Sequence, residues 1–109
     1  MSDHRTVTVQ LSSTHPDRGS IVLDGDSLTL IGEVDQGLVA AWTAQAPTDP
    51  VVSVVDSRGV TFLGSAGLAL LAGLARVAPS PIVLLADQRV VTRPLALTGL
   101  DALFTVRAS

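Results

Sequence analysis

A single serine at the start of an apolar, helix-like stretch is the residue of this sequence best placed to do chemistry. Its neighbours are Gly64, Ala66, Gly67 and Leu68. Leucines and alanines then recur every three or four residues up to Pro79, which predicts a helix that begins near Ser65. At a helix start, unpaired backbone N–H groups and the helix dipole favour an oxygen acceptor and would favour a phosphate still more. Ser65 is therefore either a helix cap or a site of modification.

The position of Ser65 also invites comparison with a serine hydrolase. The nucleophile elbow of those enzymes needs Gly-x-Ser-x-Gly, and here Gly67 fits but Leu63 occupies the place of the first glycine. A hydrolase further needs a histidine base, and the only histidines are His4 and His15, both ahead of the expected core. We interpret them as solvated surface residues and predict that the chain is not an enzyme. A hydrolase that uses Ser65 is kept as an alternative.

Composition limits the cofactors and partners that the chain can be expected to use. The two histidines and the scattered carboxylates offer no short-spaced metal-ligand set, and a phosphate-binding loop is excluded because there is no lysine, so we predict no metal and no cofactor. A formal net charge of −3 with only seven basic residues argues against nucleic acid. The partner is expected to be a protein.

Two further features bear on location. There is no cysteine, and the first residues lack the basic start and apolar block of a signal peptide, so we expect a cytoplasmic protein. The longest apolar stretch, residues 62–75, is interrupted by Ser65 and is too short to span a bilayer, so no membrane insertion is expected.

The 109 residues suit one domain with one core, and the pattern predicts an α/β fold. We expect a half-buried strand near residues 6–11, then a hairpin of residues 20–23 and 27–31 that turns at Asp24-Gly25-Asp26. Asp35 should cap a helix that Pro47 ends. The β-branched run from residue 51 predicts a strand that ends near Asp56, where Asp56-Ser57-Arg58-Gly59 provides turn residues.

The last third of the chain predicts two strands around a helix. Residues 82–86 are continuously apolar, which suits a strand covered on both faces. Residues 88–98 should form a short helix with Pro94 in its first turn, stopped by Gly99. Residues 103–106 are expected to form an edge strand. Together these elements predict a small mixed sheet with helices packed against it.

Three motifs in this order resemble the STAS domains of bacterial anti-sigma factor antagonists. They are Gly32-Glu33-Val34-Asp35, the segment from Asp56 to Leu68, and the segment from Arg93 to Phe104, which contains Leu97-Thr98-Gly99-Leu100. The family pattern reads Gly-Glu-Leu-Asp, then Asp-x-Ser-Gly-Val-x-Phe-x-Asp-Ser-Ser-Gly-Leu, then Leu-Thr-Gly-Leu. The resemblance covers roughly residues 20–106, so we assign residues 20–109 to a STAS domain and residues 1–19 to an N-terminal extension, either an extra strand or a flexible lead.

The resemblance implies a regulatory protein that binds an anti-sigma factor and thereby frees a sigma factor. In the family the first serine after the Asp is phosphorylated by the anti-sigma factor, an ATP-using serine kinase, and phosphorylation switches binding off. That serine falls on Ser65. The partner-binding residues carried over are Asp35, Arg58, Gly64, Ala66, Gly67 and Leu68.

The motif departs from the family pattern at three positions. Gly64 stands in place of the Asp, Ala66 in place of the second Ser, and Arg58 where the family usually has Ser, so that a cation which could bind a phosphate or an acidic partner is added. The alternatives are therefore a STAS scaffold that is not phosphorylated, or the soluble subunit of a lipid transporter. The apolar richness of the chain is also compatible with a homodimer.

Overall fold

The computed structural model describes residues 6–10, 19–46 and 50–108, and its framework is a six-stranded mixed sheet with strand order β1-β2-β3-β4-β5-β6. His4, His15 and Pro47, which the sequence analysis singles out, lie outside the described residues. The strands are β1 (Thr6–Gln10), β2 (Gly19–Asp24), β3 (Ser27–Val34), β4 (Val54–Leu63), β5 (Ile82–Leu85) and β6 (Phe104–Arg107). The helices are α1 (Gln36–Gln45), α2 (Ser65–Val77), α3 (Arg89–Thr98) and the short 3₁₀ helix η1 (Leu100–Leu103). The predicted α/β class is confirmed.

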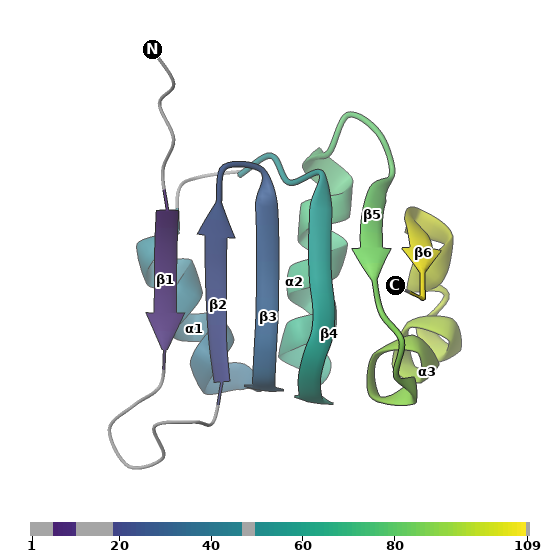
Figure 1. The fold of residues 1–109 in the computed structure, drawn as a ribbon, viewed down its shortest axis with the longest axis horizontal. Helices are drawn as coiled ribbons and strands as arrows, with labels where there is room; N and C mark the ends of the chain where they lie inside the picture. Colours follow the sequence, from purple (N-terminus) through teal and green to yellow (C-terminus); the bar gives the residue numbers. More distant parts are fainter. Residues whose placement is uncertain (1–5, 11–18, 47–49, 109) are drawn as a thin grey trace.

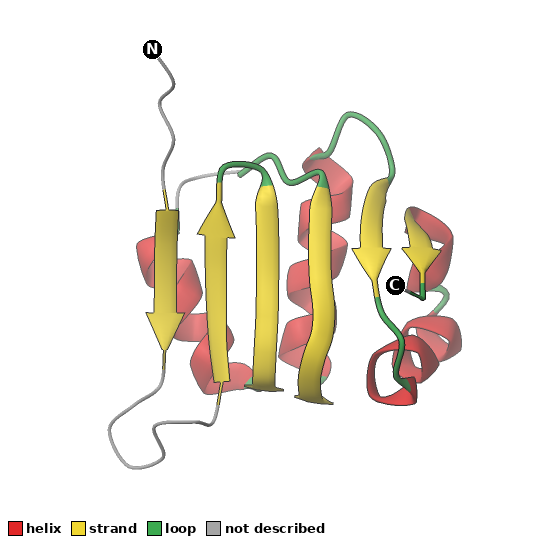
Figure 2. Ribbon diagram, in the orientation of Figure 1, coloured by secondary structure: helices red, strands yellow, loops and turns green. Residues whose placement is uncertain are grey.

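The first three strands form an antiparallel meander (Figures 1 and 2). The predicted hairpin is confirmed, with Asp24 paired to Ser27 and Gly25 at φ 64° in the turn between them. A positive φ is the conformation for which glycine has no steric penalty, which explains the Asp-Gly pair. The strand expected near residues 6–11 is also present, as β1, and it pairs with β2 at the edge of the sheet. Whether residues 1–19 are separate from the domain stays a prediction.

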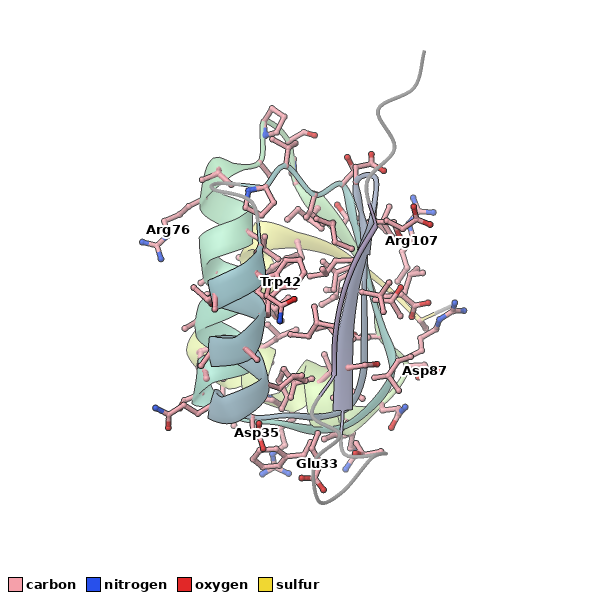
Figure 3. All side chains as sticks on the ribbon, turned by 90° about the vertical axis from the view of Figure 1, so that its left-hand side faces the viewer. Glu33, Asp35, Trp42, Arg76, Asp87 and Arg107 are labelled. Atoms are coloured by element: carbon pink, nitrogen blue, oxygen red, sulfur yellow. The ribbon has the colours of Figure 1, made fainter. Side chains whose placement is uncertain are left out.

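The helices lie on one face of the sheet because of the order of the parallel strands. β3, β4, β5 and β6 are mutually parallel neighbours, so each connecting helix crosses in the same direction along the sheet. Crossovers of this kind are right-handed, which places successive helices on the same side. Figure 3 shows α1 and α2 on one side of the sheet, while Arg107 and Asp87 lie on the other. The second face of the sheet is therefore open.

This one-sided arrangement corrects the prediction that residues 82–86 are covered on both faces. In β5 the buried residues Ile82 and Leu84 alternate with the half-buried Val83 and Leu85. The continuous apolar run arises because β5 is an inner strand, where neighbouring side chains partly cover even the open face. The run therefore indicated an inner strand correctly but not a second layer of helices.

β4 is longer than predicted, because the residues read as a turn belong to the strand. The strand does not end near Asp56 but continues to Leu63. Its register with β3 shifts twice, first where Thr29 pairs with Asp56 and Ile31 with Gly59, and again where Gly32 pairs with Val60 and Glu33 with Phe62. Each shift adds one residue to β4, as in a β-bulge. The bulges keep Val60 and Leu63 on the buried face although two exposed residues precede each of them.

Pro94 lies further into α3 than the sequence predicts. Counted from Arg89, Pro94 is the sixth residue and lies in the second turn, not the first. A proline there removes one backbone hydrogen bond and costs a free helix about 3 kcal/mol. The helix persists because Val91 and Leu95 on its inner face are buried. Gly99 ends it, as predicted, and does so in the left-handed conformation at φ 77°.

α2 packs closely against the ends of β3 and β4, as its apolar spacing predicts. Leu71 and Leu74 are buried, and Leu68, Ala75 and Ala78 pack partly buried against the same core. Close approach is possible because residue 67 has no side chain. A Cβ on Gly67 would lie 2.5 Å from Leu63 Cδ1 and 3.0 Å from Val34 Cγ1.

We therefore expect Gly67→Ala and Gly73→Ala to differ in stability although both lie in α2. Alanine is the better helix former in each case, but a Cβ on Gly73 meets nothing within 4 Å, whereas the Cβ on residue 67 overpacks the core. The free energy of unfolding should be lower for Gly67→Ala than for Gly73→Ala by about 1–3 kcal/mol. Urea unfolding followed by the fluorescence of the buried Trp42 measures both; equal stabilisation would show that α2 does not pack as described.

Candidate functional site

Ser65 is the first residue of α2 and its side chain is exposed. The N-cap of α2 is Gly64, and the helix has no side-chain capping bond. The hypothesis that Ser65 is a helix cap therefore does not apply, and the hypothesis that it is a site of modification is left. The first bond within the helix runs from the Leu68 N–H to the Gly64 carbonyl at 3.1 Å, so the amides of residues 65–67 precede the hydrogen-bonded part of the helix. No acidic side chain lies in this first turn. An accessible hydroxyl thus stands at the positive end of a helix dipole.

The carboxyl ends of β3 and β4 bring Asp35 next to this turn. The Gly64 N–H donates to the Val34 carbonyl at 3.1 Å, and Asp35 and Ser65 each follow one of these two residues. Asp35 caps α1 as predicted, since its carboxylate accepts from the Leu38 N–H at 2.9 Å. The two helix starts therefore lie side by side, and Figure 3 shows Asp35 and Glu33 at this end of the molecule.

The remaining residues of the predicted site divide by exposure. Gly64 and Ala66 are half-buried beside Ser65 and reach the surface. Leu68 is half-buried in the same way and packs in part against the core, whereas Gly67 is buried and permits the close approach of α2. Of these four residues only Gly67 is therefore covered, and a partner-binding role for the others stays a prediction.

Two apolar side chains that the sequence analysis did not select extend this surface onto the open face of the sheet. Phe62 is 50% exposed and Ile31 is 47% exposed. A Cβ on Gly64 would lie 3.2 Å from the ring of Phe62, and one on Gly59 would lie 3.5 Å from Ile31. Each glycine thus leaves room for an exposed apolar side chain. The signal in the sequence is the phenylalanine two positions before Gly64, but it indicates an exposed ring only once the bulge is known.

Arg58, the remaining predicted site residue, lies within β4, seven positions before Ser65, and its guanidinium is engaged. It binds the Asp56 carboxylate through two bonds, from Nε at 3.0 Å and from Nη2 at 2.9 Å, and Asp56 also accepts from the Arg58 N–H at 3.1 Å. Gln88 Nε2 donates to the Arg58 carbonyl, which ties the start of α3 to the strand. Arg58 is thus part of the open sheet face.

The described residues offer little for catalysis. They contain no histidine, and within them no group of three His, Cys, Asp or Glu side chains could hold a metal ion. In the same part of the chain no helix is long and apolar enough to cross a membrane. Among the described residues, therefore, no histidine is available as the base that a nucleophilic serine needs.

Comparison with known proteins gives a match among solved structures. No family model and no curated protein matches this chain. Among solved structures it is similar to the crystal structure of an anti-sigma factor antagonist from Mycobacterium paratuberculosis, with 27% sequence identity and a TM-score of 0.61 over 96% of this chain and 87% of that chain. The resemblance to STAS-domain anti-sigma factor antagonists is therefore confirmed.

The motifs on which the resemblance rests coincide with backbone requirements of the fold. Gly32 has φ 76° beside the second bulge, and Gly99 has φ 77° at the end of α3. Asp35 caps α1, and Gly67 permits the approach of α2. These motifs therefore consist largely of residues that the backbone needs at the edge of the sheet and at the start of α2. Ser65 is the exposed residue next to them.

The pair formed by Arg58 and Asp56 gives a pH-dependent prediction. The hydrogen bond from Arg58 lowers the pKa of Asp56 below its ordinary value of 3.8, against a smaller opposing effect of burial. A carboxyl with a lowered pKa stabilises the fold above its unfolded-state pKa, and the stabilisation is lost as the pH falls through the lower folded-state pKa. NMR titration should show that Arg58→Gln raises the pKa of Asp56, whereas Arg76→Gln leaves it unchanged. An equal response to both substitutions would rule out the pair as the cause.

Proposed function

We propose that this protein is an anti-sigma factor antagonist that binds an anti-sigma factor through the surface around Ser65 and so releases a sigma factor in the cytoplasm. The observation that carries the proposal is the exposed Ser65 hydroxyl at the start of α2, in a chain similar over nearly its whole length to such an antagonist. The docking surface consists of Ser65 with Gly64 and Ala66, the neighbouring Asp35, and the apolar side chains of Phe62 and Ile31.

The second part of the proposal is that the anti-sigma factor is a serine kinase and phosphorylates Ser65. A phosphate adds about −1.5 to −2 charges at neutral pH. Within this protein the charge is well placed, because it meets the amides at the start of α2 and no carboxylate of the first turn. The fold should therefore survive modification.

Docking should respond differently, because a partner that covers Ser65 must also remove water from the phosphate beside the Phe62 ring. Burial of an uncompensated charge is costly, and a penalty of only about 3 kcal/mol weakens association by more than a hundredfold. The same residue can thus separate stability from binding, which is what a reversible switch requires.

We expect incubation with ATP and a cognate anti-sigma kinase to add one phosphate to the protein, detected by intact mass. Ser65→Ala should abolish the gain, and Thr61→Ala, which removes another exposed hydroxyl nearby, should not. Ser65→Asp should weaken partner binding while its unfolding free energy stays within about 1 kcal/mol of wild type. Binding without any phosphate gain would favour the scaffold alternative, in which Gly64 and Ala66 mark a motif that no longer serves a kinase.

We also expect Phe62→Ala to weaken binding of the anti-sigma factor at least tenfold, because exposed aromatic side chains next to a docking site tend to carry much of the affinity. Val77→Ala, which truncates an exposed side chain at the far end of α2, is the matched control and should bind as wild type. Calorimetric titration measures the affinities, and thermal unfolding confirms that both variants fold. Equal affinities for the two variants would contradict a docking surface that includes Phe62.

A further inference from the structure

A groove lies on a different part of the molecule, where α3 and η1 run past the edge strand β6. It has a volume of about 440 Å³. Its apolar lining comes from Leu95 and Ala96 of α3 and from Val106 of β6. Val106 is 41% exposed although it points to the same side of the sheet as the buried Phe104. The layer between sheet and helices is thus open at this edge.

The groove coincides with a row of outward-facing backbone groups. β6 is the last strand of the sheet, and it pairs with β5 on one side only. The Arg107 carbonyl accepts from the Ala86 N–H at 2.9 Å, so the backbone groups of Arg107 face β5. Because these groups alternate along a strand, the N–H and carbonyl of Val106 face away from the sheet. Such an edge can accept another strand.

Two cations line the same groove. Arg89 and Arg93 lie one turn apart on α3, and neither side chain forms a hydrogen bond or ion pair with another described residue. Asp101 of η1 is the single carboxylate of the lining. The groove is therefore net positive in a chain whose formal net charge is −3.

We propose that this groove binds an extended segment of a partner protein, added along β6 as a further strand, whose inward face carries two apolar side chains and a carboxylate. The backbone of the segment would pair with Val106, its apolar side chains would pack against Ala96 and the exposed side chain of Val106, and its carboxylate would meet Arg89 and Arg93. This interaction is independent of the function proposed for Ser65.

Charge complementarity favours such a segment over a second copy of this chain. An antiparallel pairing of β6 with β6 of another copy would bring both pairs of groove arginines together, with only Asp101 of each copy to offset them. Like charges at an interface disfavour association, so self-pairing is opposed where an acidic segment is favoured.

The probe for the test is the capped hexapeptide Glu-Val-Thr-Leu-Thr-Glu, which as a strand presents Val, Leu and one Glu on the same face. Titrated into the ¹⁵N-labelled protein, it should shift the amide signal of Val106 and slow its hydrogen exchange. The peptide Lys-Val-Thr-Leu-Thr-Lys should bind at least tenfold more weakly. The double variant Arg89→Glu and Arg93→Glu should reverse this preference, whereas Arg76→Glu on α2, which changes the charge elsewhere, should preserve it.

Several outcomes would overturn the proposal. They are equal binding of the two peptides, binding of neither, signals that shift around Ser65 instead of Val106, or loss of the preference in Arg76→Glu. Slow exchange of the Val106 amide without peptide, together with a dimer in sedimentation, would show that a second copy occupies the edge. Failure at this edge would leave the anti-sigma factor titrations at the Ser65 surface unaffected.

Discussion

The parallel pairing of β3 with β4 is the interaction on which the rest of this structure depends. It ends with the bond from the Gly64 N–H to the Val34 carbonyl, and both strands are followed directly by helices. Because the strands are parallel, the starts of α1 and α2 must lie at the same edge of the sheet. The side-by-side position of Asp35 and Ser65 is therefore a consequence of topology, and Gly67 fixes how closely α2 approaches.

Topology also explains why this small domain keeps so much apolar surface uncovered. All three crossover helices lie on one face, so no helix covers the other. That face consists of partly buried valines and leucines, of Ile31 next to Gly59, and of the ion pair of Asp56 and Arg58. Exposed apolar side chains on such a face are expected in small numbers. Phe62 differs from most of the others because its ring lies where a side chain on Gly64, the residue before Ser65, would contact it, and we therefore place it in the docking surface together with Ile31.

Much of the fold could be predicted from local signals. The Asp-Gly hairpin, the Asp35 cap, the spacing of leucines in α2 and the stop at Gly99 each depend on residues close in sequence. β4 could not be predicted in the same way, because Asp56-Ser57-Arg58-Gly59 reads as a turn unless the register with β3 is known. The bulges and the one-sided cover of β5 are properties of pairing between distant segments, and alternation within one strand does not reveal them.

In the candidate site, too, local signals in the sequence predicted some residues, whereas others depend on the pairing of distant strands. Ser65 and Asp35 could be selected from the sequence because helix starts have local signatures, and both are where the sequence placed them. Phe62 could not be selected, because regular alternation from the buried Val60 would turn its ring toward the core. Its exposure depends on the second bulge, which the sequence alone does not reveal. Phe62 matches the family pattern, and of positions 62–64 only Gly64 departs from it. A side chain on residue 64 would contact the Phe62 ring, so the glycine in place of the aspartate removes a carboxylate from beside an exposed aromatic side chain. The surface next to Ser65 is accordingly more apolar than the family pattern implies. A partner matched to it would gain affinity from burying the ring, and it would meet a correspondingly larger desolvation cost once the serine carried a phosphate.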